Sequence, residues 1–149
     1  METHVNYVLS LVNQRLYLIN QLKKTGLSSK AREVIFHSLI ISRLLYALPA
    51  FAGFLSCADI ARFNALFRKS VRWGILDRLF NFDELIAVAE NRLFKRFSVD
   101  LNHCLHQLLP VERNTSYMLR KRGHNFSLPV FMKTLFRKSY VINYLYKNK

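Results

Sequence analysis

The 149-residue chain has few residues of the kinds that interrupt helices or cross-link a fold. It contains four glycines, three prolines and two cysteines. Because glycine and proline are scarce, long helices can run without interruption. Cys57 and Cys104 do not suggest a disulfide framework in a chain of this length, and residues 1–8 do not resemble a signal peptide. We therefore expect an intracellular protein, with nucleus and cytoplasm both left open.

Acidic residues are also scarce. The chain has 9 Asp and Glu against 23 Lys and Arg, a formal net charge of +14, although 51% of its residues are hydrophobic. A disordered basic arm would lack the apolar residues that offset chain entropy. A folded protein this basic is expected to bind an acidic partner, most commonly nucleic acid.

The positive charge is unevenly distributed along the chain. Residues 1–110 have a net charge of +6 and residues 111–149 a net charge of +8. This difference predicts a helical body over 1–110, followed by a basic C-terminal segment over 111–149 that tracks a phosphate backbone. The alternative is a basic tail that binds any polyanion without specificity.

No long hydrophobic run is present. The longest apolar run, from Leu44 to Leu55, has twelve residues and is interrupted by Pro49 and Gly53. A membrane-spanning helix needs about 20 apolar residues. We therefore expect no membrane span.

Hydrophobic periodicity predicts a mainly α fold, a bundle of about four to five helices with a basic, partly extended C-terminal segment. The second expected helix is apolar on nearly every side, which favours a central position. Residues 111–137 lack a sustained period and are expected to form an extended connector with a short strand. The expected helices cover 5–24, 28–48, 57–73, 81–110 with a possible break near residue 91, and 137–146.

The third expected helix has two different faces. At 100° per residue, one face is apolar (Ile60, Phe63, Phe67 and Val71) and the opposite face is basic (Arg62, Arg68, Lys69 and Arg72). A helix that lies between a core and a phosphate backbone needs this arrangement, although an ordinary solvated face would look the same. Six further cations would extend the contact with nucleic acid: Arg120, Lys121, Arg122, Lys133, Arg137 and Lys138.

No catalytic constellation is visible in the sequence. A nucleophile elbow, a P-loop, a Gly-rich dinucleotide loop and a paired-carboxylate motif are all missing. His103 and His106 lie three residues apart, but a structural zinc site needs four ligands. We expect no catalysis, no metal and no cofactor.

Aromatic residues are interspersed with the C-terminal basic residues. They could stack on unpaired bases, or they could pack against the helical body, which is the favoured interpretation. The residues concerned are Tyr117, Phe126, Phe131, Tyr140 and Tyr144.

Four segments of the chain form a recognisable series: residues 4–17 (HVNYV to NQRLY), 36–51 (FHSLI to RLLYALPAF), 66–72 (LFRKSVR), and 113–142 (RNTSYMLR and RKSYVI). In this order they resemble the region that follows the polymerase core of non-LTR (LINE-type) retrotransposon reverse transcriptases. In place of the family's usual residues the chain has Phe36, Phe51 and Phe67, and the terminal Trp-Asn is missing.

The resemblance implies a largely helical thumb and post-polymerase region that grips a template–primer duplex of RNA, DNA or an RNA–DNA hybrid, and that packs against an upstream polymerase core. The family's Tyr/Phe-Ala-Asp-Asp carboxylates are missing from this sequence. The expected function is therefore non-catalytic nucleic-acid binding by a fragment of such an enzyme. The alternatives are a helical protein-interaction or structural module, a peripheral binder of anionic lipid, and a retroelement remnant that does not fold stably alone.

Overall fold

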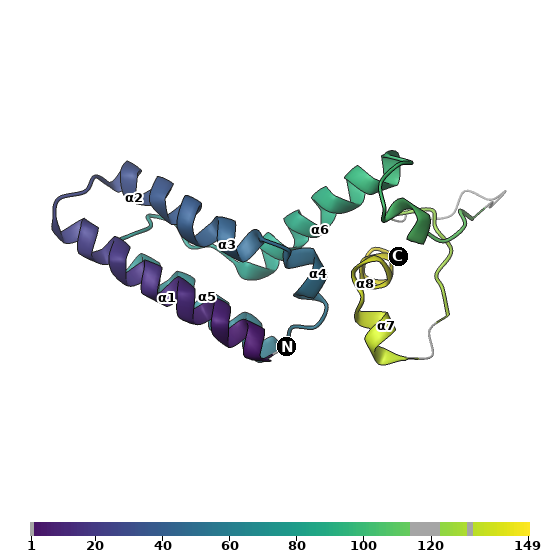
Figure 1. Cartoon of the computed structure of the whole chain (residues 1–149), viewed down its shortest axis with the longest axis horizontal. Helices are drawn as coiled ribbons and strands as arrows, with labels where there is room; N and C mark the ends of the chain where they lie inside the picture. Colours follow the sequence, from purple (N-terminus) through teal and green to yellow (C-terminus); the bar gives the residue numbers. More distant parts are fainter. Residues whose placement is uncertain (1, 114–122, 131–132) are drawn as a thin grey trace. The chain divides into compact units, whose positions relative to one another are not determined.

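A computed structural model describes residues 2–113, 123–130 and 133–149 (Figure 1). The expected mainly α class is confirmed, because helices dominate these residues and no strand occurs among them. The helices are slightly more numerous than expected, since short ones separate and follow the long ones. No helix in this part of the chain has the length and apolarity to cross a membrane.

The chain divides into two packing units. The first contains residues 1–48 and 55–88, and the second contains residues 49–54 and 89–149. This division concerns packing, whereas the expected segments 1–110 and 111–149 concern charge and composition and stay a prediction. The first unit has 11 Lys and Arg against 6 Asp and Glu (+5), and the second has 12 against 3 (+9).

Helix α1, Glu2–Lys24, begins the first unit. Apolar residues recur at every third or fourth position of its sequence and so lie on one side of the helix, which is part of the core. Gly26, at φ +92°, then turns the chain, a conformation that glycine adopts without strain. The buried residues are Val5, Val8, Leu9, Val12, Leu16 and Ile19.

The second expected helix is present as α2, Ser29–Phe36, a π-helical turn over His37–Ile41, and α3, Ser42–Leu45. It runs back along α1 (Figure 1). The expectation that this helix is central is wrong, because Val34 is 64% exposed and Leu39 is 40% exposed. The helix ends as expected before Pro49, which lies in the short helix α4, Leu48–Ala52.

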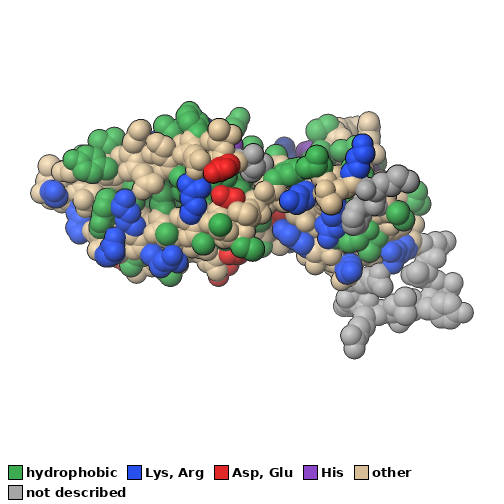
Figure 2. Space-filling view, turned by 90° about the horizontal axis from the view of Figure 1, so that it is seen from below, with side chains coloured by type: hydrophobic (Ala, Val, Ile, Leu, Met, Phe, Trp, Pro, Cys, Tyr) green, Lys and Arg blue, Asp and Glu red, His purple; other side chains and the backbone are tan. Residues whose placement is uncertain are grey.

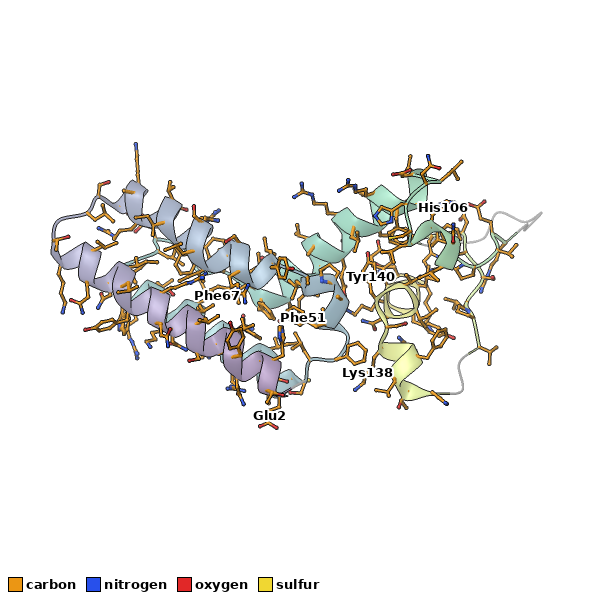
Figure 3. The ribbon with its side chains drawn as sticks, viewed as in Figure 1. Glu2, Phe51, Phe67, His106, Lys138 and Tyr140 are labelled. Atoms are coloured by element: carbon orange, nitrogen blue, oxygen red, sulfur yellow. The ribbon has the colours of Figure 1, made fainter. Side chains whose placement is uncertain are left out.

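Helix α5, Cys57–Arg72, begins at a capping box. The Ser56 hydroxyl accepts a hydrogen bond from the Asp59 backbone N–H, and the Asp59 carboxylate accepts one from the Ser56 backbone N–H. Phe67 points into the interior of the first unit (Figure 3), and Phe63 stacks on Phe82 with ring centroids 4.2 Å apart. The expected apolar face of this helix is therefore confirmed.

Helix α6, Phe82–Val99, corrects the expected helix over 81–110. It runs without a break through residue 91 and ends eleven residues early. The Asp100 carboxylate accepts a hydrogen bond from the Asn102 N–H, and the His103 Nδ1 accepts one from the Leu105 N–H. These side chains offer the backbone an alternative to the helical hydrogen bonds, so the helix stops there.

The second unit is built around an aromatic core. Phe94, Phe97, Val141, Tyr144 and Leu145 form its buried centre. In place of the expected short strand, residues 111–113 and 123–130 are non-helical and share an isolated antiparallel bridge between Glu112 and Phe126.

The last expected helix, over 137–146, is two helices in the structure: α7, Thr134–Lys138, and α8, Tyr140–Lys147. They are separated at Ser139, whose ψ of 147° is extended. The Ser139 hydroxyl donates a hydrogen bond to the Phe136 carbonyl and stabilises the end of α7.

Candidate nucleic-acid interface

Four of the predicted cations lie on the side of α5 that is turned away from the core. Arg62, Arg68 and Arg72 are exposed and Lys69 is half-buried. In Figure 2, Lys and Arg side chains recur over the surface of the first unit that faces the viewer. Lys69 lies seven residues after Arg62 and three before Arg72, and Arg68 lies four before Arg72, spacings that place neighbours on one side of a helix.

Two of these cations are bonded to α1. An Arg62 guanidinium N–H donates to the Asn6 Oδ1 at 2.7 Å, and the Lys69 ammonium donates to the Asn13 Oδ1 at 3.1 Å. In each pair the two residues are 56 positions apart in the sequence. The second pair lies seven residues further along both helices, so α1 and α5 run parallel with one heptad between the contacts. The asparagines thus hold Arg62 and Lys69 at the edge shared by the two helices.

Lys69 is fixed by further contacts. The Asn13 Nδ2 donates to the Leu9 carbonyl at 2.8 Å, which orients the Asn13 carbonyl oxygen toward Lys69. The Lys69 ammonium also lies 4.5 Å from the centre of the Trp73 ring, a cation–π distance. Lys23 donates to the Trp73 carbonyl at 2.6 Å and so stabilises the end of α5.

Arg62 is partly neutralised by an acid on its own helix. Its guanidinium lies 3.6 Å from the Asp59 carboxylate. Hydrogen bonds from Ser56 and then the charge of Arg62 hold the pKa of Asp59 below its usual value, so Asp59 is an anion near neutral pH. Arg62 is therefore the least available of the four cations.

Arg68 and Arg72 have neither a hydrogen bond nor an ion pair with any residue that the structure describes. Together with Ala65 and Lys69 they line a hollow of about 460 Å³ on the surface of α5. Two unpaired guanidinium groups and one fixed ammonium group around one hollow have the chemistry to donate hydrogen bonds to an anion.

The predicted C-terminal cations do not all lie among the described residues. Arg120, Lys121 and Arg122 fall outside them. Lys133 and Lys138 are exposed in the second unit, at the start and end of α7. The half-buried Arg137 guanidinium lies 4.2 Å from the centre of the Tyr146 ring, so part of its surface is used in packing.

Three of the C-terminal aromatic residues, Phe126, Tyr140 and Tyr144, pack against the core of the second unit. Phe94 stacks on Tyr144 at 4.2 Å, and Phe126 and Tyr140 lie against the same core. Tyr140, labelled in Figure 3, donates a hydrogen bond to the Glu90 carbonyl at 2.7 Å. These contacts agree with the packing interpretation for Phe126, Tyr140 and Tyr144, while Tyr117 and Phe131 lie outside the described residues.

The two spaced histidines use their rings to bond the backbone. The His106 Nδ1 lies 2.8 Å from the Phe97 carbonyl oxygen, and His103 accepts a hydrogen bond from the Leu105 N–H. Within residues 2–113, 123–130 and 133–149, no three His, Cys, Asp or Glu side chains are grouped so that they could hold a metal ion.

Asn6, Asn13 and Ala65 belong to the candidate site although sequence reasoning did not select them. Asn6 and Asn13, with Asn20, recur every seven residues, a spacing that could have indicated a helix–helix edge. Ala65 carries no such signal, because its importance depends on what surrounds it.

No protein-family model, no curated protein and no solved structure matches this chain.

Proposed function

We propose that this chain is a non-catalytic nucleic-acid-binding module that contacts phosphates through α5. The observation that carries the proposal is the pair of unpaired arginines, Arg68 and Arg72, beside Lys69 around one hollow. Guanidinium groups bind phosphate oxygens in a bidentate geometry, and such contacts position a nucleic acid without reading its sequence.

The spacing of these arginines favours an anionic ligand. Arg68 and Arg72 are four residues apart on one helix, where like charges are neighbours and destabilise the helix by about 0.2–0.5 kcal/mol. A phosphate placed between them removes this repulsion. Lys69 adds a third charge whose position is already fixed by Asn13 and Trp73.

The resemblance to the region after a LINE-type polymerase core supports the same proposal. It favours RNA, DNA or an RNA–DNA hybrid as the partner, and it favours an upstream polymerase core as a second partner. The net charge of +9 on the second unit supports a longer contact with the phosphate backbone.

A protein-interaction or structural role is the second candidate. The observation that favours it is the exposed apolar side of the second helix, where Val34 is 64% exposed and Tyr46, just beyond the helix, is 73% exposed. Apolar surface of this kind is typical of a protein–protein contact.

Fluorescence anisotropy with a labelled RNA–DNA hybrid, measured from about 50 to 300 mM salt, tests the proposal. The wild-type protein should bind with a steep inverse salt dependence. In R68Q/R72Q the slope of log K against log salt should become shallower by about 1.8, since each lost phosphate contact contributes about 0.9. The matched control is K24Q/K30Q, which removes the same charge from exposed positions of the first unit.

The outcomes separate the two candidates. If both double variants weaken binding equally, the effect is one of net charge and the α5 site is not the interface. If the folded wild-type protein does not bind the hybrid, or binds it without salt dependence, the proposal is wrong and the protein-interaction role is favoured.

A further inference from the structure

The basic side of α5 is hollowed on both sides of Ala65. The larger hollow, of about 460 Å³, is the one lined by Ala65, Arg68, Lys69 and Arg72. Ala65 and Lys69 also line an adjoining hollow of about 250 Å³ at the edge with α1, together with Leu9, Asn13, Arg62 and Leu66. The two hollows therefore meet at Ala65 and are bordered by all four cations.

The helix geometry explains why Ala65 adjoins three of the cations. Positions 65, 68, 69 and 72 are three, four and seven residues apart and share one side of α5. Residues three and four positions apart are neighbours on a helix surface, so Arg68 and Lys69 adjoin Ala65. A single methyl group at this position leaves the space beneath them open, whereas a longer side chain would fill it.

We infer that Ala65 controls access to the larger hollow: its small side chain admits a backbone phosphate of the nucleic acid beside Arg68 and Lys69. This inference rests on the proposed function and locates its site. The Lys69 ammonium has three N–H donors and uses one for Asn13, so donors remain for a phosphate oxygen.

The extent of the cationic side favours a linear polyanion over a single headgroup. Arg62 and Arg72 are ten residues apart, which corresponds to about 15 Å along the helix axis at 1.5 Å per residue. Phosphates of one nucleic-acid strand follow one another about every 3.4 Å along the duplex axis. The four cations therefore span several successive phosphates, and a lipid headgroup would use only part of the site.

Substitution of Ala65 by leucine tests the inference without changing any charge. Ala65 is exposed and leucine is nearly as good a helix former, so A65L should keep the helical circular dichroism of the wild-type protein. We expect A65L to lower the affinity for the labelled RNA–DNA hybrid about tenfold at about 0.1 M salt, and to reduce the salt slope by about 0.9, the contribution of one phosphate contact.

Two matched variants complete the experiment. A61L makes the same change one helical turn earlier, at an exposed alanine that lines neither hollow, and A65S keeps a small side chain at the site. Both should bind like the wild-type protein and keep its salt slope. If leucine affects α5 in general, A61L should also bind the hybrid more weakly than the wild-type protein.

The results distinguish this inference from the proposed function. If R68Q/R72Q weakens binding but A65L binds like A61L, the hollow is not used and the inference is overturned, while the proposed function stands. If the wild-type protein does not bind the hybrid, both are wrong. Displacement of the hybrid by phosphatidylserine vesicles at equal phosphate concentration would also overturn the inference, because the site would then prefer a membrane surface.

Discussion

Replacement of Lys147 by methionine should lower the free energy of unfolding of the second unit by about 2–3 kcal/mol. Glu90 is only 3% exposed, and the Lys147 ammonium lies 3.2 and 3.1 Å from its two carboxylate oxygens. Among the residues that the structure describes, no other side chain forms a hydrogen bond or ion pair with this carboxylate. Methionine keeps most of the apolar stem of lysine and removes the charge.

The magnitude follows from the burial of the two partners. Removal of one member of a fully buried ion pair costs about 3–5 kcal/mol, because the other charge stays buried without compensation. Glu90 meets this condition, but the Lys147 side chain is 47% exposed, so water already screens part of the attraction. The expected loss is therefore below that range.

Urea unfolding monitored by far-ultraviolet circular dichroism measures the effect. With a urea dependence of about 2 kcal/mol per molar, the midpoint of K147M should fall by about 1 M. The matched control K149M removes an exposed lysine of the same unit and should not move the midpoint. The fluorescence of Trp73, the single tryptophan, reports separately on the first unit.

A second variant separates loss of the pair from loss of packing. In E90Q/K147M the buried charge is gone as well, so most of the lost stability should return. If K147M unfolds at the wild-type midpoint, Glu90 is not a buried anion that depends on Lys147, and the reasoning is refuted. If the double variant is no more stable than K147M, the loss comes from packing of the lysine stem.

Two further predictions concern the second unit. In G53A the new Cβ would lie 2.1 Å from the Lys138 carbonyl oxygen. We therefore expect faster hydrogen exchange in α7 and α8 and a free energy of unfolding lower by about 3 kcal/mol. The control G26A, with nothing within 4 Å of its Cβ, should leave the exchange of α7 and α8 unchanged. Burial raises the pKa of Tyr140 and Tyr144 above the ordinary 10.0. An absorbance titration should therefore show that these phenols ionise at a higher pH in the folded protein than in the unfolded chain. The stability that the neutral phenols contribute is present below pH 10 and is lost as the pH rises above it.

Those parts of the fold that depend on local periodicity could be predicted from the sequence. The buried stripe of α1 and the two faces of α5 follow from spacing alone, because each helix needs only one apolar side to pack. The ends of helices depend on individual hydrogen bonds. Asp100 stops α6 at Val99, and Ser139 separates α7 from α8. Asp and Ser also occur inside helices, so the residue type alone does not mark these ends.

The candidate site was predictable as a set of charges but not as a set of contacts. From the sequence alone, Arg62 and Arg68 belong to the same basic side of α5, and nothing distinguishes their roles. The structure makes them different, because Arg62 is bonded to Asn6, 56 residues away, and lies beside Asp59, whereas Arg68 borders the open hollow. Substitution of Arg62 therefore removes a contact between α1 and α5 together with a charge, so a weaker-binding R62Q would mix helix packing with ligand binding, whereas R68Q reports on the ligand alone. A test of phosphate binding on α5 must consequently begin with Arg68 and Arg72.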